Sequence, residues 1–175
     1  MNNTIDTGGY SLTINNSGGV VINGTLINSY NAEPNGDSLV KTNTGTLMIS
    51  RSGAISPYQV FNVNLWEGTL AVEGRADNAL FQVEQGSLIV DGTIAGLQLL
   101  GYGASISGTG SFGSVENFTG NTFYGGTGTF TPGDNGAPGI MQCDSFFPAN
   151  LASVYDAFQI IINGTQPGVG YGQLL

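Results

Sequence analysis

The chain has 175 residues, and its 3 basic and 12 acidic residues give a formal net charge of -9. So few cations exclude a phosphate-binding surface, and with it nucleic acid as a partner. The hydrophobic content of 40% is too high for a disordered tail, and no apolar run of about 18 residues predicts a membrane-spanning helix. One domain is the expectation at this length.

Short alternating segments between turn residues predict β-strands along the chain. Apolar side chains stand two apart in Thr46–Ser50, Thr69–Glu73 and Ser87–Asp91. This is the period at which side chains share one face of a strand. Glycine, asparagine, serine and threonine separate such segments, and helix signals are nearly absent. We therefore expect an all-β fold.

A glycine-led triplet, Gly-(Thr/Ser)-(Leu/Ile/Phe), recurs along the chain. The commonest step between triplets is about 18 residues, and the step is slightly longer nearer the amino terminus. Glycine suits such positions because some corners of a tightly turning chain need a positive φ. The triplets begin at Gly24, Gly45, Gly68, Gly86, Gly92, Gly110 and Gly128.

The recurring step predicts columns of like side chains. One column is Leu70, Leu88 and Ile106, and a second is Ile94, Phe112 and Phe130. Like side chains recur at a fixed interval when each coil of a solenoid sits on the previous one. We predict a right-handed, single-stranded parallel β-helix, a solenoid of roughly eight or nine coils of 18 to 23 residues.

The whole chain, residues 1–175, is expected to form a single solenoid segment. Residues 1–38 hold the first coils and a polar loop at residues 31–37, and residues 39–131 hold the regular repeats. Residues 132–175 hold a Pro-Gly turn and the closing strands. Because the first residues lack the pattern of a signal peptide and the chain stops on an apolar pair, both ends look cut from something longer.

The order of these motifs resembles a known family. Leu39–Ser50 looks like the opening of a passenger-associated transport repeat, also called the autotransporter-associated β-strand repeat, and Val60–Val72 resembles its close. Ile5–Ile14 is similar to the strand that often precedes the repeat, Thr131–Gly139 to the family's paired Pro-Gly turn, and Gly170–Leu174 to its closing strand motif. The chain therefore resembles a bacterial autotransporter passenger domain.

The resemblance implies a function as well as a fold. It implies a structural β-helical stem of an exported passenger, which supports secretion and display on the surface of a Gram-negative bacterium. The partner would be an outer-membrane β-barrel translocator downstream in the same precursor. The repeat-motif residues, with a structural role, would be Lys41, Gly45, Thr46, Leu47, Gly68, Thr69 and Leu70.

No constellation in the sequence favours catalysis or a cofactor. With no histidine in the chain, serine nucleophiles and Cys143 lack their usual activating base, and Cys143 is expected to be a small, partly buried apolar residue. Gly108–Gly113 matches a dinucleotide-binding glycine pattern, but turn and strand residues follow it instead of a helix. Asp134 and Asp144 are interpreted as solvated carboxylates. We therefore expect a protein that is not an enzyme and holds no metal.

Two alternative functions remain open. An adhesin-type surface for glycans or host proteins would use exposed aromatic side chains, for which Trp66, Tyr102 and Tyr124 are the candidates. A fragment of a β-helical polysaccharide lyase or tailspike would need a cation near carboxylates, and Lys41, Arg51 and Arg75 are the cations of the chain. End-to-end self-association is a further expectation, because the terminal strand edges of a solenoid are not covered.

Overall fold

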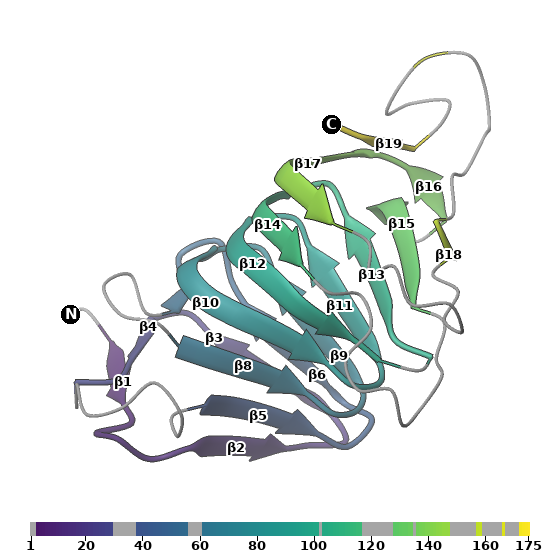
Figure 1. Cartoon of the computed structure of the whole chain (residues 1–175). Coiled ribbons are helices and arrows are strands. Elements are labelled where there is room, and N and C mark those ends of the chain that lie inside the picture. Colours follow the sequence, from purple (N-terminus) through teal and green to yellow (C-terminus); the bar gives the residue numbers. More distant parts are fainter. Residues whose placement is uncertain are drawn as a thin grey trace.

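The structure, a computed structural model, is a parallel β-helix in which short strands stack coil upon coil (Figure 1). The fold class predicted from the repeat is thus confirmed. None of the described residues is helical, so the described part of the chain contains no helix that could cross a membrane. The described residues are 3–29, 38–55, 61–101, 103–116, 128–134, 136–147, 157–158, 166 and 172–175.

Strand positions follow the glycine-led triplets, and nineteen strands lie among the described residues. They are β1 (Thr4–Asp6), β2 (Leu12–Asn15), β3 (Gly19–Ile22), β4 (Thr25–Ile27), β5 (Ser38–Thr42), β6 (Thr46–Ile49), β7 (Ala54–Ile55), β8 (Phe61–Leu65), β9 (Thr69–Val72), β10 (Arg75–Val83), β11 (Ser87–Val90), β12 (Thr93–Leu100), β13 (Ser105–Gly108), β14 (Ser111–Glu116), β15 (Thr129–Asp134), β16 (Ala137–Pro138), β17 (Ile140–Phe147), β18 (Ala157–Phe158) and β19 (Gln173–Leu174).

The strands form two sheets that enclose one core. An eight-stranded sheet contains β3, β6, β9, β11, β13 and β15, with β16 and β18 at its end. An eleven-stranded sheet contains the others. In the first coils this larger sheet uses two short strands per coil, but β10 pairs with β7 at Arg75 and with β8 from Ala79 to Val83. From β10 onward, one long strand therefore takes the place of two.

The predicted register holds through the middle of the solenoid. Leu88 pairs with Leu70 on one side and with Ile106 on the other, as the first predicted column requires. All three side chains are fully buried. Ile94 pairs with Phe112, which confirms the start of the second column. Stacked aliphatic side chains of this kind supply the core, because each one buried is worth about 1.5–3 kcal/mol.

The place predicted for Phe130 in the second column is wrong. Phe130 pairs with Ile106 in the eight-stranded sheet and so extends the first column, while Phe112 pairs with Cys143. The step from Ile106 to Phe130 exceeds the step from Leu88 to Ile106, because the chain between β14 and β15 is longer than in the preceding coils. Phe112 and Phe130 still meet, with ring centroids 5.8 Å apart across the core.

Two flanking motifs differ in detail from the prediction. Ile5–Ile14 is not one strand, because a turn with positive φ at Gly8 (58°) and Gly9 (90°) separates β1 from β2. The paired Pro-Gly turn is an antiparallel hairpin of β15 and β16, in which Gly133 pairs with Pro138. The predicted polar loop at residues 31–37 lies outside the described residues.

Candidate functional site

Lys41 of the repeat motif is fully buried inside the solenoid. It points inward because strand alternation in β5 puts it on the same side as Leu39, and it stacks between Ile14 and Leu65 in the neighbouring coils. A buried ammonium needs hydrogen-bond acceptors. Its Nζ donates to the backbone oxygens of Thr42 (2.8 Å), Asn43 (2.6 Å) and Glu67 (3.3 Å).

This ammonium joins two successive corners between the eleven- and eight-stranded sheets. Asn43 has a φ of 66°, the one positive value at a described residue other than glycine, and Gly68 has a φ of 81°. A Cβ at Gly68 would meet the Asn43 oxygen and come within 2.9 Å of Lys41 Nζ. Burial lowers the pKa of Lys41, and Glu67 opposes this shift. The lysine therefore closes a corner and does not face a ligand.

The two glycine-led triplets of the repeat motif lie in register. Thr46 pairs with Thr69 and Leu47 with Leu70. The backbone N–H of Gly45 donates to Asn16 (2.9 Å), and that of Thr69 donates to Gly45 (3.1 Å). A Cβ at Gly45 would lie against the backbone oxygens of the coil before it. These residues therefore connect one coil to the next at a corner that has no room for a side chain.

Among the predicted ligand-stacking aromatics, Trp66 is the one that the described residues include. It lies at the corner between β8 and β9, where its backbone N–H donates to the Lys41 oxygen (2.9 Å) and the residue is 59% exposed. Glu67 follows it in sequence and Glu84 lies at the matching corner of the next coil, and both are exposed. Tyr102 and Tyr124 lie outside the described residues.

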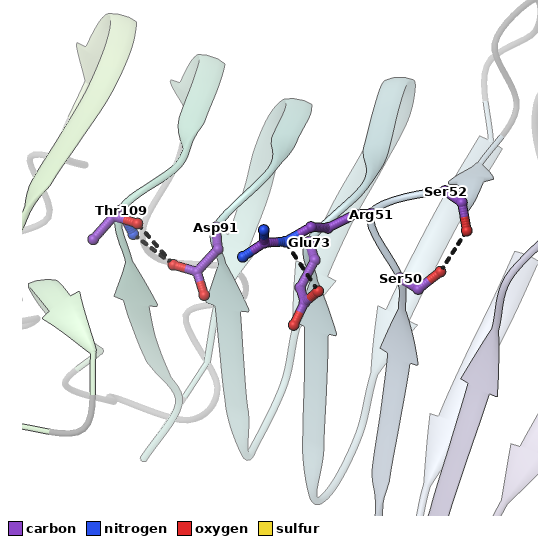
Figure 2. A network of polar contacts seen from close by, with 6 residues as sticks. All are labelled: Ser50, Arg51, Ser52, Glu73, Asp91 and Thr109. Atoms are coloured by element: carbon purple, nitrogen blue, oxygen red, sulfur yellow. Dashed lines mark hydrogen bonds and ion pairs between the residues drawn. The ribbon is translucent and has the colours of Figure 1, made fainter.

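A polar ladder runs along another corner, which follows the strands of the eight-stranded sheet (Figure 2). Glu73 pairs with Arg51 at 3.6 Å, and Asp91 accepts from both the N–H (2.9 Å) and the hydroxyl (3.0 Å) of Thr109 in the next coil. This ladder was not predicted. The equal steps from Glu73 to Asp91 and from Asp91 to Thr109 were the signal that could have revealed it.

The remaining candidates carry little chemistry. Cys143 is partly buried and packs on the core as predicted, and burial, with a smaller effect of Asp144, raises its pKa. Gly108–Gly113 spans the end of β13, the corner at Thr109 and Gly110, and the start of β14. In the part of the chain that the structure describes, no three acidic, cysteine or histidine side chains gather as a metal site would need.

Comparisons with family models, with curated proteins and with solved structures find no match to this chain.

Proposed function

We propose that this chain is a structural β-helical stem of an exported, autotransporter-type passenger at the surface of a Gram-negative bacterium. Its role would be to support secretion and surface display, with a β-barrel translocator downstream in the precursor as its partner. The order of the sequence motifs suggests the family, and the stacked fold supports the role.

The observation that carries the proposal is a continuous column of stacked core residues in the eight-stranded sheet. The column of Leu47, Leu70, Leu88, Ile106 and Phe130 passes through five successive strands of the eight-stranded sheet. Each coil can therefore template the next as the chain emerges, since a repeat contacts mainly its neighbours. Such stepwise folding outside the cell suits a stem that is exported unfolded.

The experiment places this segment between a signal peptide and an outer-membrane β-barrel in a Gram-negative host. An amino-terminal epitope reports surface display by protease accessibility. Leu70→Asp puts a charge into the core column and should reduce display strongly, whereas Thr69→Asp, at the outward neighbour in the same strand, should leave most of it. Equal display of both variants and the parent would contradict the proposal.

Glycan recognition is a second candidate, and the 59% exposure of Trp66 favours it. An indole face on a rigid corner suits stacking on a sugar ring. Trp66→Ala should abolish any signal on a glycan array, whereas Tyr10→Ala, at an aromatic that is 79% exposed in another turn, should preserve it. Lys41 does not suit the lyase alternative, because its ammonium is enclosed by backbone oxygens inside the solenoid.

A further inference from the structure

The amino-terminal end of the solenoid presents uncovered strand edges. Strands β1, β2 and β3 pair on one side, with β4, β5 and β6 respectively, and no described strand pairs with their outer edges. We call these three strands the open end, and β2 is its outermost strand in Figure 1. Such an edge offers backbone N–H and C=O groups to another strand.

The columns of the core reach the surface at the open end. In four columns the terminal side chain is partly exposed, whereas the side chain stacked on it in the next coil is fully buried. Ile5 is 44% exposed and pairs with the fully buried Leu26. The other three pairs are Leu12 with Leu39, Ile14 with Lys41 and Val20 with Leu47. Another edge of the same kind, placed on the open end, would bury these terminal side chains as the coils bury each other.

The open end lacks the features that protect strand edges from pairing. Lysine, proline and β-bulges commonly guard an edge. Strands β1, β2 and β3 contain no lysine, arginine or proline, and their pairing shows no register shift. Asp6 is the one charged residue among residues 1–29, although the chain has a net charge of -9. Its carboxylate accepts from the N–H groups of Gly8 and Ser29, at 2.9 Å each. Two open ends would therefore repel each other little.

The carboxyl-terminal end of the solenoid does not match the open end. There β16 folds back on β15 as an antiparallel hairpin, and β18 also pairs with β15. Asp134 in β15 and Asp144 in β17 put carboxylates at this end. The open end of a second copy, by contrast, offers the same three uncharged edges and the same apolar columns. A second open end is therefore the best complement that this chain provides.

We propose that two copies of this chain associate head to head through their open ends, as a two-fold symmetric dimer. A two-fold axis normal to the eight-stranded sheet sets β3 of one copy antiparallel to β3 of the other and keeps their core faces on the same side. Val20 and Ile22 face inward. The matching register therefore puts Val20 opposite Ile22 of the partner subunit, and Val21 opposite Val21 of the partner subunit. The core columns then continue through the interface. This inference does not depend on the stem function.

Sedimentation velocity of the whole chain over a range of concentrations measures the association. A monomer–dimer equilibrium is expected. Val20→Lys puts a charge at the end of a core column and should weaken dimerisation at least tenfold. Asn64→Lys adds the same charge to the outer face of β8, away from the open end, and should change dimerisation less than twofold. Circular dichroism checks that both variants keep their strands. A parent chain that stays monomeric at every concentration would overturn the proposal.

A single cysteine tests the head-to-head arrangement. In a Cys143→Ser background, Val21→Cys should give a disulfide-linked dimer on mild oxidation, because the symmetric register brings the two copies of this position together. Trp66→Cys is the control, since Trp66 is 59% exposed and Val21 is 53% exposed, but Trp66 lies at a corner in the middle of the solenoid. Equal crosslinking of the two variants would refute this register. Assemblies that grow beyond two copies would mean head-to-tail stacking and would also refute the proposal.

Discussion

The entry coils, β2 to β8, and the regular coils, β9 to β14, build the same cross-section in two ways. In the regular coils the strands of the eight-stranded sheet pair at a constant short step, as from Leu70 to Leu88 and from Leu88 to Ile106. In the entry coils the step is longer and varies, from Leu12 to Leu39 in one sheet and from Thr46 to Thr69 in the other. In the eleven-stranded sheet, each longer coil has two separate short strands, whereas each shorter coil has one long strand, which is β10, β12 or β14.

The two regions also close their corners differently. In the entry coils, a buried ammonium, Lys41, gathers backbone oxygens, and Asn43 takes the left-handed conformation. In the regular coils, Gly86 has a φ of 94°, and a Cβ there would meet the oxygen of Gly68. Close backbone contact at a glycine occurs in both regions, since a Cβ at Gly45 would also meet backbone oxygens of the coil before it. Among the described residues, the entry coils add an ammonium that satisfies the oxygens of the corner.

The largest effect is expected in the core of the regular coils. Leu88→Ala removes a fully buried side chain between Leu70 and Ile106 and should lower the free energy of unfolding by about 2–5 kcal/mol. Urea denaturation followed by circular dichroism measures it. Ile89→Ala, at the half-buried outward neighbour, is the matched control and should cost clearly less. Equal losses would mean that the inward and outward assignments are wrong.

A glycine corner should be the next most sensitive feature. Gly86→Ala forces a side chain into a positive φ, which alone costs about 1–3 kcal/mol, and presses its Cβ on the Gly68 oxygen. Gly103→Ala is the comparison, because Gly103 also has a positive φ (73°) but a Cβ there would meet no atom within 4 Å. Thermal melting should give Gly86→Ala a lower melting temperature than Gly103→Ala. A lower melting temperature for Gly103→Ala would refute the close contact between coils at Gly86.

The lysine corner should tolerate change somewhat better. Lys41→Met nearly keeps the length of the side chain but leaves the oxygens of Thr42, Asn43 and Glu67 without their donor. An unsatisfied buried acceptor costs about 1–3 kcal/mol, although loss of the charge removes its desolvation cost. We therefore expect Lys41→Met to lower the free energy of unfolding at neutral pH by an amount near the lower end of that range. Urea denaturation measures this loss. A more stable variant would show that these hydrogen bonds do not offset burial.

Alkaline pH should sharpen this comparison. Burial lowers the pKa of Lys41 from its ordinary 10.5, so between the lowered pKa and 10.5 the unfolded chain binds a proton that the folded chain does not. The free energy of unfolding therefore rises with pH in that window. The advantage of the parent over Lys41→Met should grow as pH approaches 10.5. A shrinking advantage would mean that the oxygens hold the ammonium form more strongly than water does.

The sequence predicted most where its repeat is regular. The triplets at Gly68 and Gly86 placed Leu70 and Leu88 correctly, because no residues are inserted between those coils. Phe130 was misplaced because an insertion changes the phase without changing the motif. Gly24 and Gly45 looked like successive repeats, but Gly24 lies at the corner before β4 and Gly45 at the corner before β6.

The candidate sites were harder than the fold to predict from the sequence, because they depend on contacts between coils. The repeat motif indicated that Lys41 has a structural role. It did not indicate that backbone oxygens enclose the ammonium, because a lysine at an inward position does not fit the apolar pattern of a strand. The polar ladder needs the register of the strands to be known before Glu73, Asp91 and Thr109 become neighbours at one corner. Trp66 could be placed at a corner, but its exposure depends on the packing around that corner.

The most direct test of the stacked coils is a pair of engineered cysteines in a Cys143→Ser background. Ser87 and Ser105 pair in adjacent strands, with hydroxyl oxygens 2.9 Å apart, and neighbouring strands lie about 4.8 Å apart, within disulfide reach. Ser87→Cys with Ser105→Cys should oxidise to an internal disulfide. Ser87→Cys with Ser107→Cys, two residues out of register, should not. Efficient crosslinking of the second pair and not the first would contradict the stacking of one coil on the next in this register.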